Sequence, residues 1–384
     1  MNTDYGSAPL NKDYLIIAMF GHKRIPSREG GIEIVVEELA TRMVALGNDV
    51  TCFNRKGHHV SGAQFDTEVS KEYRGVKLKQ VLTVNRKGLA AMSSSFFAAF
   101  RSAFGKYDVV HIHAEGPAAM CWLPKLFGKK VVVTVHGLDW ARAKWGGFAT
   151  KYIKWGETQA VRHADSIIVL SRNVQDYFKK EYDRDTVFIP NGVDKPEKRE
   201  TVEIKKLWGL EKDSYVLFLG RLVPEKGLKY LVEAWKEIKT EKKLVIAGGS
   251  SDTEEFLKEL KAMSPENVVF TGFQQGRVLE ELYSNAYIYC LPSDLEGMPL
   301  SLLEAMSYGN CCVVSDIPEC TEVVEDKAVT FPHGNVGELK RIIQELLDNE
   351  QSVLEYKKTA AEFITKKYNW DDVVDKTMNL YSYK

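Results

Sequence analysis

The chain has 384 residues, which is too long for one ordinary hydrophobic core and predicts about two domains. Lysine and arginine total 52 against 53 acidic residues, so the formal net charge is −1. This balance argues against a general nucleic-acid-binding protein, which needs a basic surface.

The cysteines and the N-terminal segment indicate a cytoplasmic protein. Residues 1–12 are polar and lack the apolar segment of a signal peptide, and no run of about 20 apolar residues could span a membrane. The cysteines lie mostly in apolar runs, without a CxxC pair or a histidine at zinc spacing, so we expect buried free thiols. They are Cys52, Cys121, Cys290, Cys311, Cys312 and Cys320.

Short apolar runs alternate with amphipathic stretches along the chain. In the first half the runs are 14–20, 50–53, 109–112, 131–135 and 166–170, separated by helical patterns such as 32–46 and 148–161. In the second half they are 215–219, 243–247, 268–270, 286–291 and 311–314. Strands that alternate with helices imply parallel sheets covered on both faces. The sequence therefore predicts an α/β fold of two Rossmann-like domains whose sheets face each other across a ligand-binding cleft.

The domain boundary is expected within residues 189–196, where turn-forming residues follow a strand and a charged segment begins. This gives an N-terminal domain of residues 13–190 and a C-terminal domain of residues 191–367. Residues 368–384 form a last amphipathic segment, and its pattern alone favours a helix that closes the second domain.

Gly30 and Gly31 follow the first predicted strand, where a helix begins. Glycines at this point let a phosphate group or an acceptor approach the backbone closely, although an ordinary turn explains them equally well. Since the pattern is not a full GxGxxG fingerprint, a dinucleotide-dependent oxidoreductase is poorly supported.

Segment 86–106 contains four cations, no acid and four phenylalanines. It could lie on an anionic membrane to reach a lipid-linked acceptor. It could also be a helix between two strands with its phenylalanines packed inward. The pattern favours the second interpretation.

Three histidines lie at the ends of predicted strands. His111 and His113, with Glu115 close behind, have the spacing of a metal pair, but no third ligand is evident and we expect the two rings on opposite faces of the strand. We therefore predict no metal and no cofactor. His136 follows the strand 131–135, where it is either a structural residue or a donor to a sugar hydroxyl.

The segment after His136 mixes aromatic and cationic residues, which stack on sugar faces and pair with phosphates. It could form an acceptor platform from Asp139, Trp140, Arg142 and Lys144. An ordinary loop with buried tryptophans is the alternative.

In the second half, Arg221 and Lys226 bracket a turn that follows Gly220 at the end of a predicted strand. Two cations at this edge of a sheet can neutralise a diphosphate without a metal. A solvated basic turn would show the same residues.

Residues 293–306 place Glu296 and Glu304, separated by seven residues, across a strand-to-helix junction. Between them the helix N-terminus presents backbone N–H groups, which favour a negative ligand group. Carboxylates accept sugar and ribose hydroxyls while amides meet phosphate, so the combination suits a nucleotide sugar. The alternative is a surface loop whose acids cap a helix. The residues of this junction that we expect to bind the donor are Gly297, Met298, Pro299 and Leu300.

Glu-Gly-x-Pro-Leu followed by a second glutamate resembles the signature of retaining glycosyltransferases of the family-four type, and the Arg221–Lys226 loop strengthens the match. The resemblance covers the second domain well and extends to Gly30, Gly31 and His136. It implies the two-Rossmann, type-B fold, with the last helix crossing back to the first domain.

The resemblance also implies a function and residue roles. A metal-independent enzyme would move a sugar from a nucleoside-diphosphate donor to a hydroxyl acceptor, in bacterial surface polysaccharide or glycoconjugate synthesis. Arg221 and Lys226 would hold the diphosphate as leaving group, Glu304 the ribose and Glu296 the sugar ring, which His136 would contact from the opposite domain. The glycines and the 297–300 amides complete the donor site.

The resemblance further implies a same-face displacement assisted by the leaving diphosphate. A lipid-linked saccharide acceptor and contact with the anionic inner face of the cell membrane are compatible with it. A nucleotide-sugar epimerase and a non-catalytic sugar-nucleotide-binding protein remain as alternatives.

Overall fold

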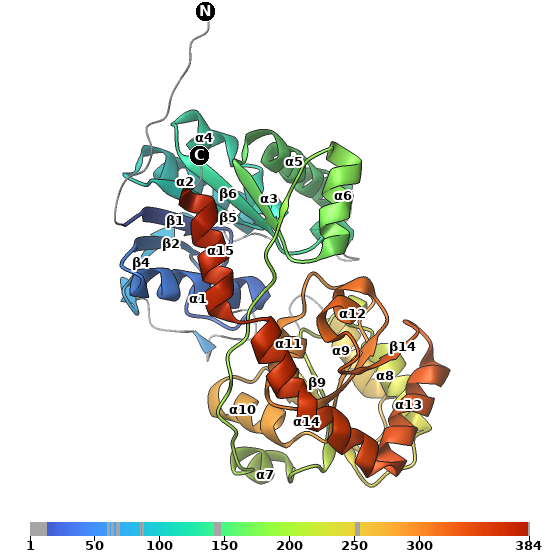
Figure 1. Ribbon diagram of the computed structural model, residues 1–384. Coiled ribbons are helices and arrows are strands. Elements are labelled where there is room, and N and C mark those ends of the chain that lie inside the picture. Colours follow the sequence, from blue (N-terminus) through green and yellow to red (C-terminus); the bar gives the residue numbers. More distant parts are fainter. Residues whose placement is uncertain are drawn as a thin grey trace, which may run out of the picture.

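The computed structural model describes residues 14–59, 62, 65–66, 70–84, 86, 88–141, 147–249 and 254–382. Two largely parallel sheets, each flanked by helices, form two domains stacked one above the other (Figure 1). The predicted α/β fold of two Rossmann-like domains is thereby confirmed. The apolar runs became strands because they are buried on both faces, and the amphipathic stretches became the helices that cover them.

The N-terminal sheet consists of β1 (Ile16–Phe20), β2 (Asp49–Arg55), β3 (Glu72–Tyr73), β4 (Val76–Val81), β5 (Val109–His113), β6 (Lys130–Val135), β7 (Ser166–Val169) and β8 (Val187–Phe188). Its strand order is β3-β4-β2-β1-β5-β6-β7-β8, and every neighbouring pair is parallel except β3 with β4. In the register of the central strand, Ile17 lies beside both Val50 and Val109.

The C-terminal sheet is parallel throughout, in the order β11-β10-β9-β12-β13-β14. Its strands are β9 (Tyr215–Leu219), β10 (Lys243–Ala247), β11 (Val268–Gly272), β12 (Ile288–Leu291), β13 (Cys311–Ser315) and β14 (Val329–Phe331). The switch in strand order lies between β9 and β12, which is where parallel α/β sheets bind ligands.

The described part of the N-terminal domain contains six α-helices and one 3-10 turn. They are α1 (Gly31–Ala45), α2 (Leu89–Phe104), α3 (Glu115–Ala118), α4 (Trp122–Leu126), the 3-10 turn η2 (Asp139–Ala141), α5 (Gly147–His163) and α6 (Arg172–Tyr182). Helices α2 to α5 pack on the sheet face that carries Ala18 and Phe20, whereas α1 packs on the face that carries Ile17 and Met19.

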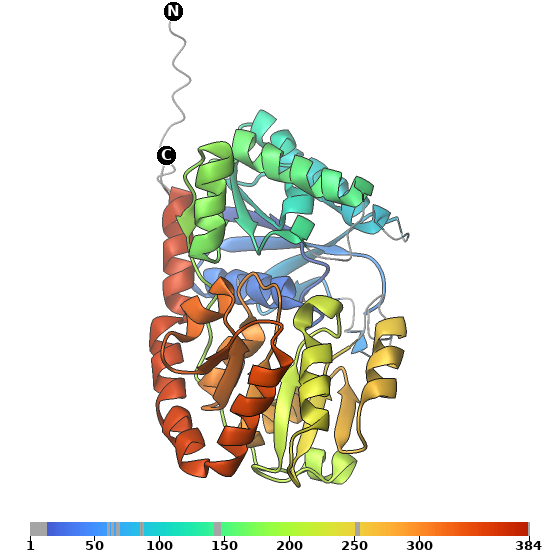
Figure 2. The same cartoon turned by 90° about the vertical axis from the view of Figure 1, so that its right-hand side faces the viewer.

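The C-terminal half adds α7 (Glu203–Trp208), the 3-10 turn η3 (Pro224–Lys226), α8 (Leu228–Lys236), α9 (Glu254–Met263), α10 (Gly276–Asn285), α11 (Leu300–Ser307), α12 (Pro318–Val324), α13 (Val336–Asp348), α14 (Glu350–Lys367) and α15 (Trp370–Ser382). Figure 2 shows α14 and α15 in red along one side of both domains. Helix α14 packs on α11, and α15 packs on α1 of the other domain.

The segment between the domains is held against the start of α15. Gly192 lies so close to Trp370 that a side chain there would collide with its ring and backbone. The N–H of Val193 donates to the Tyr368 carbonyl at 2.8 Å, and Arg42 of α1 pairs with Asp371 at 3.0 Å. One continuous apolar cluster runs from the N-terminal sheet through α15 into the C-terminal domain.

All six cysteines are buried free thiols, as predicted. Among the described residues, no helix is long and apolar enough to cross a membrane.

Candidate active site

The loops after β6 and β12 touch each other between the two domains. A Cβ atom on Gly297 would overlap the carbonyl oxygen of His136, and one on Gly137 would lie 2.8 Å from the Gly297 Cα. Gly137 also has a φ of +133°, a conformation that disfavours any side chain. Two glycines therefore allow the backbone contact that brings His136 beside the Glu296 loop.

Lys226 and Glu296 form one largely buried ion pair. Lys226 ends η3, just after β9, and its Nζ lies 2.5 Å from Oε1 of Glu296, which follows β12. The same oxygen accepts from the Ser293 hydroxyl at 2.6 Å. The Lys226 and Glu296 side chains are only 13% and 7% exposed. Lys226 was expected to bind the diphosphate and Glu296 the sugar ring, and the two side chains contact each other directly.

The loop that carries Arg221 lies against the loop after β10. The N–H of Gly220 donates to the Ala247 carbonyl and that of Leu222 to the Gly249 carbonyl, each at 3.1 Å. A Cβ on Gly248 would overlap the Gly220 carbonyl oxygen. Arg221 is half-buried at the end of β9, on the same edge of the sheet as Lys226.

Glu304, in the second turn of α11, bridges both domains. Its carboxylate accepts from the Tyr283 hydroxyl at 3.0 Å and pairs with the Arg28 guanidinium, which comes from the loop before α1. The charge of Glu304 raises the pKa of Arg28 above its ordinary value. Sequence reasoning missed Arg28, although a cation two residues before Gly30 was a usable signal.

The N-terminus of α11 faces the first domain. Pro299 is the N-cap, and its carbonyl accepts from the N–H groups of Leu302 and Leu303 at 3.0 and 3.2 Å. The N–H groups of Leu300 and Ser301, which precede them, have no helical carbonyl behind them to accept a hydrogen bond. Leu300 lies against Gly31, whose added Cβ would be 3.4 Å from the Leu300 Cδ1, so the two predicted donor-binding segments lie together.

The interdomain segment also supports this loop. The Asn191 side-chain amide donates to the Met298 carbonyl at 3.3 Å, and the Asn191 N–H meets the Met298 sulfur at 3.0 Å. Sequence reasoning used Asn191 only as a turn former.

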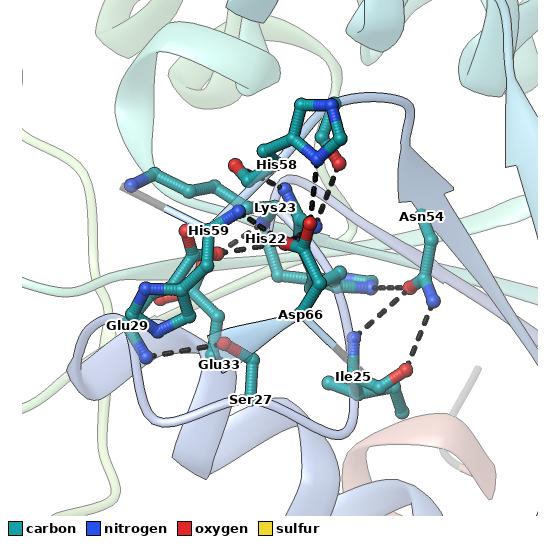
Figure 3. A network of polar contacts seen from close by, with 12 residues as sticks. His22, Lys23, Ile25, Ser27, Glu29, Glu33, Asn54, His58, His59 and Asp66 are labelled. Carbon is teal, nitrogen blue, oxygen red and sulfur yellow. Dashed lines mark hydrogen bonds and ion pairs between the residues drawn. The ribbon is translucent and has the colours of Figure 1, made fainter. Parts of the chain in front are cut away.

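The loop between β1 and α1 is braced by a network of polar contacts (Figure 3). Nε2 of His22 lies 2.9 Å from Oδ1 of Asn54, whose amide donates to the Ile25 carbonyl at 2.9 Å. The Lys23 N–H donates to Glu33 at 2.8 Å. Burial lowers the pKa of His22 to about 4, so the ring is neutral at neutral pH. The network positions the loop that carries Arg28.

The two histidines of β5 and the one that follows β6 form a buried row. His136 Nε2 lies 3.1 Å from His113 Nδ1, and the rings of His113 and His111 are 4.2 Å apart. The expectation that the rings of His111 and His113 lie on opposite faces of the strand is wrong, because residues two positions apart in a strand point to the same face of the sheet. His111 in turn contacts the Tyr381 hydroxyl of α15 at 2.6 Å.

Burial keeps His111 and His113 neutral, since it lowers the pKa of His111 to about 3 and that of His113 well below its usual value. Within the described part of the chain, no group of three or more His, Cys, Asp or Glu side chains is arranged to hold a metal ion.

Of the proposed acceptor residues, Asp139 and Trp140 are described, whereas Arg142 and Lys144 lie outside the described residues. The Asp139 N–H donates to Oε2 of Glu115 at 2.8 Å. The Lys154 ammonium lies 4.1 Å from the centre of the half-buried Trp140 ring. This places η2 on α3 and α5, beside His136.

Helix α2 confirms the helix expected between two strands in segment 86–106, and Phe97 packs against the core. The expectation that all four phenylalanines point inward is wrong. Phe96, Phe100 and Phe104 are 43%, 47% and 59% exposed. The Phe104 ring contacts the Phe127 ring in a tilted arrangement, with 4.4 Å between the ring centres. The inward face consists of small residues, because the helix lies close to the sheet: Ser94, Ser95, Ala98, Ala99, Ser102 and Ala103.

Comparison with known proteins identifies the family of the chain. Residues 29–196 match the profile of Glycosyltransferase Family 4, and residues 200–370 match that of Glycosyl transferases group 1. An uncharacterized glycosyltransferase of Methanocaldococcus jannaschii is 26% identical over 95% of this chain and 97% of its own.

One further relative is named for a reaction, and one similar solved structure contains a ligand. The Escherichia coli UDP-Gal:alpha-D-GlcNAc-diphosphoundecaprenol alpha-1,3-galactosyltransferase is 30% identical over 55% of this chain and 58% of its own. The Anabaena protein HepE, solved in complex with UDP-glucose, superposes with a TM-score of 0.78 at 18% identity, covering 96% of this chain and 99% of HepE. The paired family matches, which together span both domains, show that the chain belongs to the glycosyltransferases of the family-four type.

Proposed function

We propose that this enzyme is a retaining, metal-independent glycosyltransferase that moves a sugar, expected to be a hexose, from a nucleoside-diphosphate sugar to a hydroxyl acceptor. The observation that carries the proposal is the largely buried Lys226–Glu296 pair in the loops after β9 and β12, where Glu296 directly precedes the Gly297 that contacts His136. Bound UDP-glucose in HepE supports the donor class. In this proposal, residues 13–190 form the acceptor-side domain and residues 191–367 form the domain that binds the nucleotide sugar. Residues 368–384 cross back to the first domain.

The donor would lie along the C-terminal side of the cleft. Its diphosphate would meet Arg221, Lys226 and the N–H groups at the start of α11, since cations and a helix N-terminus together favour a phosphate without a metal. Its ribose hydroxyls would bind Glu304. Because Arg28 now pairs with that carboxylate, donor binding has to move the guanidinium or share Glu304 with it.

The sugar ring would lie between Glu296 and His136. In the transfer step, the bond from the anomeric carbon to the diphosphate oxygen breaks and a bond to the acceptor oxygen forms on the same face. The acceptor proton passes to an oxygen of the departing diphosphate. Lys226 and Arg221 stabilise the negative charge that develops on this leaving group, and His136 donates to a sugar hydroxyl.

A lipid-linked saccharide is the proposed acceptor, in bacterial surface polysaccharide or glycoconjugate synthesis at the cytoplasmic face of the membrane. The diphosphoundecaprenol substrate named for the E. coli relative supports this class. The exposed apolar residues of α2 and α4, which pack on each other, supply a surface that could lie in the lipid interface. This α2–α4 surface comprises Leu89, Phe96, Phe100, Phe104, Leu126 and Phe127, with Arg86 exposed beside it.

A panel of nucleoside-diphosphate sugars tests the proposal, with diphosphate release measured with and without lipid-linked saccharides and with a metal chelator. We expect one donor to be consumed only when an acceptor is present, with undiminished rate in the chelator. A product that retains the donor's anomeric configuration would support retention. Release of a rearranged sugar without acceptor would support an epimerase, and donor binding without turnover a non-catalytic protein.

A further inference from the structure

Two carboxyl groups are buried beneath the η2 loop of the N-terminal domain. Glu115 begins α3 and is 1% exposed, and Glu157 lies in α5 and is 0% exposed. The two helices approach closely at Gly156, where a Cβ atom would overlap the Glu115 carbonyl oxygen. This close packing holds the two side chains face to face.

The hydrogen bonds around the pair leave one oxygen of each carboxyl group without a donor. Glu157 Oε1 accepts from the hydroxyls of Tyr177, at 2.7 Å, and Tyr182, and Glu115 Oε2 accepts the Asp139 N–H. Among the described residues, neither Glu115 Oε1 nor Glu157 Oε2 has a donor, and both are fully buried. Two ionised carboxylates in that position would repel each other in a poorly hydrated space, whereas one added proton turns the contact into a hydrogen bond.

Among the described residues, the groups that face the pair do not supply a compensating positive charge. Asp139 adds a further negative charge from η2, and the two tyrosine hydroxyls from α6 are neutral donors. Lys154 of α5 lies over the Trp140 ring instead. Burial, Asp139 and the hydrogen bond to Glu157 raise the pKa of Glu115 well above its usual value.

We infer that Glu115 and Glu157 share a single proton, and that this acid pair is a positioning element for the loop that carries His136 and Asp139. The inference about catalysis rests on the proposed function, since that loop would contact the transferred sugar and the acceptor. With the proton present, Glu115 accepts the Asp139 N–H and donates to Glu157. Loss of the proton puts two adjacent negative charges beneath Asp139 and weakens the contact that fixes η2.

Infrared spectroscopy tests the shared proton without any reference to activity. The spectrum of the parent protein at neutral pH should contain the carbonyl stretch of a protonated carboxylic acid, and the difference spectrum against Glu115→Gln should show its loss. Glu181→Gln, an exposed change on α6, is the matched control and should leave the band unchanged. A parent spectrum with no band that depends on Glu115 would overturn the inference, even if the enzyme proves to be the proposed transferase.

The pH profile of transfer tests the positioning role. Glu115→Gln preserves the hydrogen bonds of the protonated pair, because the side-chain NH2 of glutamine can donate to Glu157 and its carbonyl oxygen can accept the Asp139 N–H. We expect the kcat of the parent to decline at alkaline pH, as the shared proton is lost. Glu115→Gln should keep at least half of the parent kcat at neutral pH and should not show this decline. Glu115→Ala should lower kcat at least tenfold at every pH while donor affinity stays within twofold. Identical pH profiles for the parent and Glu115→Gln, or equal losses in the Gln and Ala variants, would refute the positioning role.

Discussion

Removing the Lys226 charge should damage both the folded state and the donor site, and the two effects can be separated. Its partner Glu296 is only 7% exposed and would keep a single donor, the Ser293 hydroxyl. Breaking a buried ion pair by deleting one partner costs about 3–5 kcal/mol. That is a large part of the roughly 5–15 kcal/mol by which domains are stable. Loss of one charge-assisted phosphate contact costs about 1.5–3 kcal/mol, or roughly 10- to 150-fold in dissociation constant.

The assay compares Lys226→Met, Glu296→Gln and the double variant by urea unfolding and by calorimetric titration with the nucleoside diphosphate of the preferred donor. The double variant should regain most of the stability lost in Lys226→Met, because no charge is left buried alone, but it should not regain the affinity. Lys229→Met is the matched control, since Lys229 forms an exposed ion pair with Glu259 at 2.7 Å and should cost under about 1 kcal/mol. Equal stability of Lys226→Met and the parent, or a double variant no more stable than Lys226→Met, would refute the reasoning.

Three further predictions concern other parts of the molecule. Glu304→Gln should weaken nucleoside-diphosphate binding in the same calorimetric assay, whereas Arg28→Ala should tighten it a few-fold because a competing cation is removed; the opposite pair of signs would exclude competition at Glu304. The neutral His22, whose pKa in the folded protein is about 4, binds fewer protons than it does in the unfolded chain. Its contribution to stability is therefore complete above about pH 6.5 and is lost as the pH falls toward 4, by up to about 3 kcal/mol. His22→Gln should flatten this part of the stability profile, and an unchanged acid dependence would contradict it. Replacing Phe100 and Phe104 with serine should reduce sedimentation with anionic vesicles by at least tenfold in partition coefficient without changing urea stability, since each buried phenylalanine contributes about 1.5–3 kcal/mol; equal sedimentation would remove the α2–α4 surface from the membrane proposal.

Local pattern was sufficient for the fold. The apolar runs of β1, β5 and β9 are long enough and uniform enough to be strands buried on both faces, and their alternation with amphipathic helices leaves few arrangements other than parallel sheets. The Glu296 loop and the Arg221–Lys226 turn were recognisable because their residues are close in sequence. The six buried cysteines followed from the same apolar runs.

Helix α2 shows where local pattern was insufficient. Its sequence has apolar residues on more than one face, so periodicity could not decide which face meets the sheet. The structure turns Ser94, Ala98 and Ser102 inward and leaves Phe100 and Phe104 exposed. Small side chains allow the helix to approach the sheet closely, and that preference depends on the space available between them.

The sequence by itself determined the two-sheet architecture and the residue types at the ends of its strands. Only the tertiary structure decided how those residues pair. Lys226 meets Glu296 across 70 residues, Arg28 meets Glu304 across 276, and Glu115 faces Glu157 from a different helix. The first and third contacts depend on how loops and helices pack within one domain. The contact between Arg28 and Glu304 depends on the relative placement of the two domains, to which the packing of α15 on α1 and the glycine contact at Gly297 contribute. Local periodicity cannot predict these contacts. It indicates which face of a helix or strand is buried, but not which side chain from another element lies against that face.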